Sequence, residues 1–263
     1  MARPTFAGAV RVATWEWMLY RRMWATNLLS SFLQPLLYIL GLGVGVGTLV
    51  DRNTSAMSTL GAPSYVAFVA PGLVITTGMS LASLDSMWPV MGSLKWNRAY
   101  FGIAATPLEA VDIVCGHALK MAARCVAACG LVALALALFP DTRSWGLIPT
   151  VVIAALVGIA FAMPVMAVSV KAEHDGVFAN LNRFVVIPLF LFGGAFYPLS
   201  KLPTVVQWIA RATPLWHGTT VARQFTFGAV NWLEVCGHLG YMVVWAVAGT
   251  VVATRRLRRK LYP

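Results

Sequence analysis

Long apolar runs recur along the whole chain of 263 residues. A helix of about 20 apolar residues crosses the hydrocarbon core of a bilayer. Such a helix also satisfies its backbone groups internally, and we find no alternating pattern of the kind a membrane β-barrel needs. The pattern therefore predicts an all-α integral membrane protein with six spans. They lie near residues 27–50, 64–88, 111–138, 147–170, 183–198 and 232–253.

Composition supports this class. Charged residues make up 11% of the chain and hydrophobic residues 59%, whereas about 25% of the residues of a soluble domain are charged. So few charges cannot cover a globule with polar surface. We expect one membrane domain over 1–263, with an interface helix in 1–26, the six-span bundle in 27–253 and a basic tail in 254–263.

The distribution of lysine and arginine predicts the orientation. Most of the 20 basic residues fall before the first span, around the second and third spans, and after the sixth. Cytoplasmic loops carry such an excess, so both termini of this multi-pass protein are expected in the cytoplasm. The formal net charge of +11 then indicates contact with anionic lipid headgroups rather than with nucleic acid.

Two further segments have amphipathic or broken patterns. Residues 8–24 combine helical spacing with several tryptophans and a tyrosine, which is typical of a helix lying at the membrane surface. Residues 193–228 are too polar for a span and too apolar for an ordinary loop. Pro203 and Pro214 suit first helical turns there. We expect two short external helices that re-enter the membrane.

Candidate chemistry is sparse. The run "GLGVGVG" at 41–47 lacks the spacing of a nucleotide-binding loop, so Gly43 and Gly47 are interpreted as a small-residue face for helix packing. The four cysteines and four histidines show neither metal-ligand nor catalytic spacing. We therefore expect no catalytic, cofactor-binding or metal site on this chain, and the absence of a Walker lysine motif argues against ATP binding.

The stretch "SLKWNRAYFGIAATPLE" at 93–109 interrupts the apolar pattern with charged and aromatic residues. Apolar positions recur at helical spacing from Leu94 to Ala105, which predicts a short amphipathic cytoplasmic helix. Thr106 and Glu109 have the spacing of a capping box that would start the third span. The helix would cross the mouth between spans two and three, where a soluble partner could dock.

At this point the chain resembles a known family, the membrane subunit of bacterial ABC-2 type exporters. It is similar to the branch that holds nodulation lipo-oligosaccharide and daunorubicin-resistance permeases. The resemblance covers roughly residues 15–253. The segments that show the resemblance are "QPLLYILGLGVGVG" at 34–47, "FVAPGLVITTGM" at 68–79, "NRAYFGIAATPLEAVDIVCG" at 97–116 and "GGAFYPLSKLP" at 193–203.

The resemblance implies a set of partners. A second membrane subunit, identical or paralogous, would complete a dimer, and two copies of an ATP-binding subunit would hold ATP and Mg²⁺. Each would dock on a coupling helix between spans two and three. That helix would contain Lys95, Trp96, Asn97, Arg98, Ala99, Tyr100 and Phe101. Family members often carry acidic residues and a Gly-Thr here, where this chain has "WNRAYF".

Polar residues inside the predicted spans have two interpretations. Asp85 ends the second span and is either solvated or paired. Lys120 and Arg124 lie four residues apart in the third span, where snorkelling to the surface competes with a role in holding an anionic headgroup or a carboxylate. Arg183 allows the same alternatives.

These observations together predict a function for the chain. The chain would be an exporter permease without its own catalysis, moving an amphiphilic or hydrophobic substrate such as an antibiotic or a glycolipid. A gradient-driven secondary transporter is the alternative, and it would need carboxylates near the middle of the membrane. An intramembrane enzyme would need clustered catalytic residues, which the sequence does not show.

Overall fold

The computed structural model describes residues 6–22, 33–52 and 60–262, and these residues form helices and connecting turns without a strand. The longer helices are α1 (Phe6–Arg21), α5 (Tyr65–Asp85), α6 (Trp88–Lys95), α8 (Ala110–Ala137), α9 (Leu147–Lys171), α12 (Thr204–Arg211), α13 (Pro214–Phe227) and α14 (Trp232–Leu261). The shorter ones include η1 (Gly41–Gly47), α3 (Thr48–Val50), α7 (Ala99–Ala104), α10 (Gly176–Leu181), η3 (Asn182–Val186) and α11 (Ile187–Phe192). The predicted all-α class is confirmed.

Five stretches of the described residues are long and apolar enough to span a membrane. They are Leu33–Val50, Tyr65–Lys95, Ala110–Ala137, Leu147–Lys171 and Trp232–Leu261. The span predicted over 183–198 has the wrong bounds, because the helix there runs over Gly176–Phe192. At 1.5 Å per residue it is about 25 Å long, somewhat less than the core of a bilayer.

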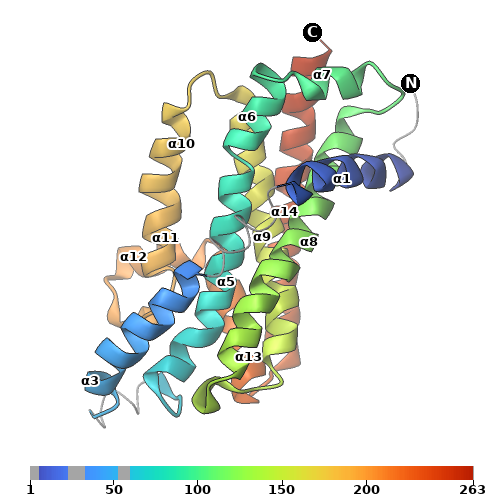
Figure 1. Cartoon of the computed structure of the whole chain (residues 1–263). Helices are drawn as coiled ribbons and strands as arrows, with labels where there is room; N and C mark the ends of the chain where they lie inside the picture. Colours follow the sequence, from blue (N-terminus) through green and yellow to red (C-terminus); the bar gives the residue numbers. More distant parts are fainter. Residues whose placement is uncertain (1–5, 23–32, 53–59, 263) are drawn as a thin grey trace.

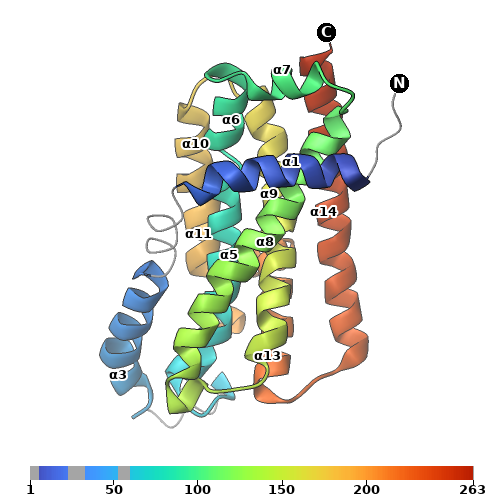
Figure 2. The same cartoon turned by 45° about the vertical axis from the view of Figure 1, so that its right-hand side comes forward.

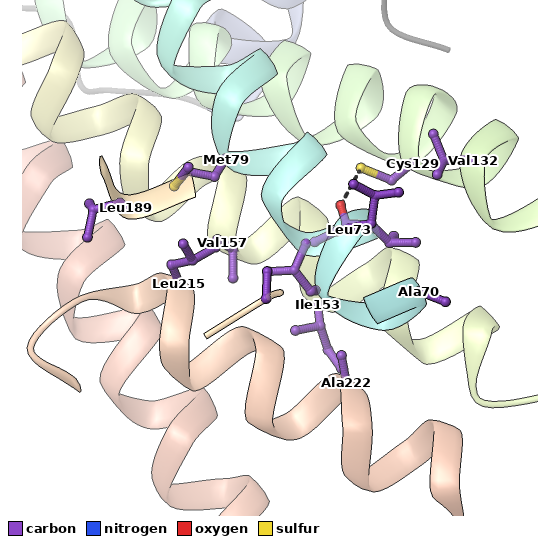
Figure 3. Close-up of a cluster of buried hydrophobic side chains, with 14 of the residues drawn as sticks. Ala70, Leu73, Met79, Cys129, Val132, Ile153, Val157, Leu189, Leu215 and Ala222 are labelled. Carbon is purple, nitrogen blue, oxygen red and sulfur yellow. Dashed lines mark hydrogen bonds between the residues drawn. The ribbon is translucent and has the colours of Figure 1, made fainter. Parts of the chain in front are cut away.

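Helix α9 forms the centre of the bundle and packs against α5, α8, α13 and α14 (Figure 1). Helix α5 is apolar on all sides and almost entirely buried. Its Leu73 and Met79 meet Ile153 and Val157 of α9 and Leu215 of α13 in a continuous apolar core (Figure 3). The bundle is therefore held mainly by aliphatic packing, and its polar contacts are concentrated elsewhere.

The molecule has two distinct ends. At one end, named here the α7 end, α1 crosses the face of the bundle on α8, and α6, α7 and the last turns of α14 lie beyond it (Figure 2). The opposite end, named the α13 end, holds α13 and the turn between α8 and α9. The two helices expected within 193–228 are present as α12 and α13, with Pro214 in the first turn of α13.

The basic segment after residue 253 is helical and partly buried. Helix α14 continues to Leu261, and Leu257 and Leu261 are buried against the bundle. Arg256 Nη1 and Lys260 Nζ donate hydrogen bonds to the carbonyl oxygens of Ala167 and Val170, at 2.9 and 2.7 Å. Cations are favoured at the C-terminal end of a helix, so these residues stabilise the end of α9.

Small residues allow α1 to approach α8 closely. The buried face of α1 consists of Gly8, Ala9, Val12, Ala13 and Glu16. A Cβ atom at Gly116 of α8 would lie 2.6 Å from Val12 Cβ and 2.8 Å from the Ala9 carbonyl oxygen. The crossing point therefore has no room for a methyl group on α8.

Adding that methyl group gives a test of the crossing. We expect Gly116→Ala to lower the free energy of unfolding by about 1–3 kcal/mol, the usual cost of overpacking. Gly130→Ala on the same helix meets open space, so it should be neutral or stabilise by up to about 1 kcal/mol through helix propensity. Thermal unfolding of both variants in detergent measures the difference. Equal shifts would mean that α1 does not pack at Gly116.

Candidate functional site: a buried ion cluster at the α7 end

The most polar part of the interior lies where α1 crosses α8. Glu16 of α1 is only 7% exposed. The Tyr100 hydroxyl donates to Glu16 Oε1 at 3.1 Å, Lys120 Nζ lies 3.1 Å from Oε2, and His117 Nδ1 lies 2.9 Å from Oε2. One carboxylate thus joins the interface helix, the short helix α7 and the membrane-length helix α8.

The contacts continue into α5 and α9. His117 Nε2 lies 3.0 Å from Ser86 Oγ, at the residue that ends α5. The Ser86 carbonyl oxygen accepts a hydrogen bond of 2.7 Å from Ser169 Oγ of α9. We name Glu16, Ser86, Tyr100, His117 and Lys120 the Glu16 cluster. His117 and Lys120 can share one partner because residues three apart lie on the same face of a helix.

The neighbouring charges determine whether the Glu16 carboxyl is ionised. Burial by itself raises the pKa of this carboxyl, but the attraction and hydrogen bonds of His117 and Lys120 outweigh burial and lower the pKa from 4.5 to about 2. Burial and the neighbouring carboxylate raise the pKa of Tyr100 well above its ordinary value. Glu16 is therefore ionised at neutral pH, and Tyr100 keeps the proton that it donates.

A second ion pair lies beside the cluster. Arg124, one turn beyond Lys120, pairs with Asp85 at the end of α5, and its guanidinium carbon lies 4.6 Å from the centre of the Tyr20 ring of α1. This ion pair and the charged residues of the Glu16 cluster line one cavity of about 280 Å³ beneath α1. We call it the α1 cavity.

The structure brings together three of the four intramembrane residues singled out from sequence. Lys120 and Arg124 are buried and each is paired with a carboxylate, which favours the second interpretation over snorkelling to the surface. Asp85 is paired rather than solvated. Arg183 lies exposed in η3 and makes no contact with this cluster. Glu16 was not anticipated, although its i+4 spacing from Val12 places it on the buried face of α1.

The predicted coupling helix is divided. A single helix from Leu94 to Ala105 is wrong, because α6 ends at Lys95 and α7 begins at Ala99. Arg98 between them has a left-handed backbone with φ of 51°, and the Asn97 side chain accepts from the Ala99 amide at 3.1 Å. The polar side chain of Asn97 therefore starts a new helix in the middle of the expected one.

The seven residues predicted for partner docking face different ways. Lys95, Trp96, Asn97 and Arg98 are exposed, and Trp96 is 69% exposed. Ala99 and Phe101 are half-buried, whereas Tyr100 is 1% exposed and faces the Glu16 cluster. We name residues 95–98 the exposed turn. Among these seven residues, those of the exposed turn offer their side chains to a soluble partner, and Tyr100 connects the turn to the interior.

Two other sequence expectations need comment. The capping box at Thr106 and Glu109 is wrong by three residues, because Glu109 is itself the N-cap of α8 and its amide donates to Asp112 Oδ2 at 2.9 Å. The Thr106 hydroxyl instead donates to the Ile103 carbonyl oxygen at 2.6 Å. Gly47 is buried within η1, while the packing of Gly43 lies outside the described side chains.

The fold and the site together define a multi-pass helical membrane protein whose exposed turn is connected to a buried ion cluster. The model of the ABC-2 type transporter family matches residues 10–227, and the chain belongs to this family. It is 31% identical to nodulation protein J of Rhizobium leguminosarum bv. trifolii over 95% of this chain and 93% of that protein. Identity to nodulation protein J of Rhizobium meliloti (strain 1021) is 27%, over 96% and 94%.

A more distant relative is the inner membrane transport permease YadH of Escherichia coli (strain K12), 23% identical over 91% of this chain and 90% of that protein. No solved structure matches the chain. Membership of the family and similarity to these relatives show that the chain is a permease subunit of an ATP-binding-cassette exporter in the inner membrane. Membership of this family implies a separate ATP-binding partner.

Removing Glu16 tests the ion cluster. We expect Glu16→Ala to lower the free energy of unfolding by about 3–5 kcal/mol, because Lys120 stays buried without its carboxylate. The double variant Glu16→Ala/Lys120→Met should recover much of the loss, since no lone charge remains. Thermal unfolding in detergent compares them, with Glu234→Ala at the α13 end as a control for an exposed carboxylate. Equal losses in the single and double variants would contradict the ion pair.

The lowered pKa of Glu16 predicts a specific pH dependence. The folded state favours the carboxylate, so its contribution to stability is complete above about pH 4.5 and is lost as pH falls toward 2. The stability difference between the unmodified chain and Glu16→Gln, whose side chain does not titrate, should shrink as pH falls from 6 to 3. Melting temperatures measured in parallel test this. A difference that stays constant with pH would place Glu16 outside the ion pair.

Proposed function

We propose that this chain exports an amphiphilic or hydrophobic substrate, a drug or antibiotic or a lipid or glycolipid, and that ATP hydrolysis on the separate subunit drives the transport. That subunit would dock on the exposed turn and bind ATP and Mg²⁺, so the permease itself needs no nucleotide site. The single observation that carries the proposal is the connection from exposed Trp96 and Arg98, through buried Tyr100, to Glu16 of α1.

The turn is fixed to the rest of the α7 end on both sides. The Lys95 ammonium group donates to the backbone carbonyl of Glu173, in the turn between α9 and α10. On the other side, Tyr100 is held by Glu16, which is held by Lys120 and His117 of α8. A force applied by a partner to the exposed turn would therefore reach α1 and α8 without first unfolding a flexible loop.

The charge distribution supports a cytoplasmic α7 end. Helices α1, α6 and α7 share this end with the basic last turns of α14 (Figure 2). Basic residues gather on the cytoplasmic side of membrane proteins. We propose that both termini are cytoplasmic and that a second permease subunit, identical or paralogous, completes the assembly with two ATP-binding subunits.

A gradient-driven carrier is less well supported. Such carriers place ionisable groups near the middle of the membrane, where protonation or ion binding drives the cycle. Eight of the nine acidic residues of this chain fall in loops, in α1 or near the ends of the long helices, and the ninth, Asp85, lies ten residues before the end of the apolar stretch Tyr65–Lys95. Asp85 and Glu16 are already paired with cations at the α7 end.

Replacing the exposed side chains of the turn tests docking. We expect Trp96→Ala/Arg98→Ala to reduce recovery of the ATP-binding subunit with a tagged permease by at least about tenfold, since aromatic and arginine side chains dominate interfaces. The double variant Arg143→Ala/Trp145→Ala removes the same two residue types from exposed positions at the α13 end. It should leave recovery unchanged. Quantitative mass spectrometry of the captured complexes gives the ratio.

The backbone conformation provides a further control. Arg98→Gly removes the side chain but suits the left-handed backbone at this position. Arg98→Gly should therefore weaken docking as much as Arg98→Ala does. Full recovery of the partner by both double variants, at the turn and at the α13 end alike, would mean that the ATP-binding subunit docks elsewhere.

A further inference from the structure

The basic residues in the last turns of α14 have different surroundings. Arg256 and Lys260 donate to carbonyl oxygens at the end of α9, so their charges are used inside the fold. Arg255 and Arg259 are exposed, and they form no hydrogen bond, ion pair or ring contact within the part of the chain that the structure describes. We name Arg255 and Arg259 the outward arginines.

No acidic side chain of this chain neutralises the outward arginines. All nine aspartate and glutamate residues lie in the described ranges 6–22, 33–52 and 60–262. The ion pairs formed within these ranges join Glu16 and Asp85 to other cations. The outward arginines therefore present two positive charges to whatever molecule lies beside the end of α14.

The outward arginines continue an apolar ridge of the same helix. Val247 and Val251 precede them at intervals of four residues, and side chains at this interval form a continuous ridge on a helix. Val247 is 56% exposed and Val251 is 41% exposed. Helix α14 lies at the edge of the bundle (Figure 2), so this valine ridge is accessible to lipid.

The length of the ridge matches one leaflet of a bilayer. Half of a hydrocarbon core of about 30 Å is about 15 Å, which a helix covers in about ten residues. If Arg255 and Arg259 reach the headgroup level, Val247 and Val251 lie beside the acyl chains of the same leaflet. Guanidinium groups suit phosphate oxygens. A headgroup with a net negative charge fits two arginines better than a zwitterionic one, whose ammonium group they would repel.

We propose that the outward arginines and the valine ridge bind an anionic phospholipid, with its phosphate on Arg255 and Arg259 and an acyl chain along Val247 and Val251. The net charge of +11 indicates contact with anionic headgroups in general, whereas this proposal assigns the contact to one place on one helix. Its cytoplasmic leaflet rests on the orientation given under the proposed function, but the binding itself does not. A lipid held there fixes the depth of α14 in the membrane.

The first experiment compares phospholipids with identical acyl chains. The full-length permease in a neutral detergent is titrated with phosphatidylglycerol, phosphatidylethanolamine or phosphatidylcholine, and native mass spectrometry measures the lipid that stays bound. We expect phosphatidylglycerol to bind most tightly. Arg255→Gln/Arg259→Gln should weaken its binding about 25-fold, since each basic residue beside anionic lipid contributes a factor of about five. Equal affinities of the three lipids for the unmodified chain would overturn the proposal.

The neighbouring cations provide a matched control. Arg256→Gln/Lys260→Gln removes the same number of charges from the same turns, but these side chains bond to α9. This variant should melt at a lower temperature and keep most of the preference for phosphatidylglycerol. Arg255→Lys/Arg259→Lys retains both outward charges and should retain binding. Equal losses of lipid binding in the two glutamine variants would mean that net charge alone attracts the lipid, and would overturn the site.

Other occupants would be recognised by different results. Displacement of phosphatidylglycerol by sodium phosphate, but not by sodium chloride of the same ionic strength, would indicate a site for a free anion. Loss of the ATP-binding subunit from Arg255→Gln/Arg259→Gln with lipid binding unchanged would show that a soluble partner covers the arginines. Either result would overturn the lipid site, and we expect neither.

The orientation is tested separately. A C-terminal tag on the permease should resist a protease added to intact spheroplasts. Cleavage of the tag from outside would contradict the cytoplasmic orientation and the choice of leaflet. Because the lipid titration in detergent does not depend on orientation, this failure is distinguishable from failure of the lipid site.

Discussion

A buried carboxylate determines the architecture of the α7 end. An isolated ionised group in the interior is prohibitively costly, so Glu16 can be buried only where cations meet it. Lys120 and His117 supply that charge from α8, and Tyr100 supplies a hydroxyl from α7. Buried ion pairs add little net stability, but they make other arrangements expensive. The position of α1 across the bundle is therefore specified by charge as much as by packing.

Packing and charge depend on each other at this crossing. Glu16 reaches Lys120 because α1 lies directly on α8, and α1 can lie there because Gly8 and Gly116 have no side chains. A methyl group at Gly8 would collide with Asp112, which caps the start of α8. The same few residues thus fix the beginning of α8, the place of α1 and the neutralisation of Glu16.

Hydropathy predicted most of the fold, because an apolar run of membrane length has few alternatives to a helix in lipid. It misplaced the helix Gly176–Phe192, because the first half of this helix, "GVFANLNR" at 176–183, is partly polar and follows the charged residues of 171–175. The break at Arg98 was not predictable, since arginine rarely takes a left-handed backbone. The capping box failed because Glu109 and Asp112 offered the same spacing three residues later. Glu16 and His117 are 101 residues apart, and no local pattern relates them.

These contacts also bear on how a permease without a nucleotide site could respond to its motor. Tyr100 is the fully buried residue of α7, and its hydroxyl reaches α1 rather than a spanning helix. Under the proposed function, a displacement of the exposed turn would therefore act first on a helix that lies across the bundle. Because α1 contacts α8 through Glu16 and the α5–α8 ion pair through Tyr20, tilting it would act on two spanning helices at once. A coupling helix attached to α8 alone would move only one.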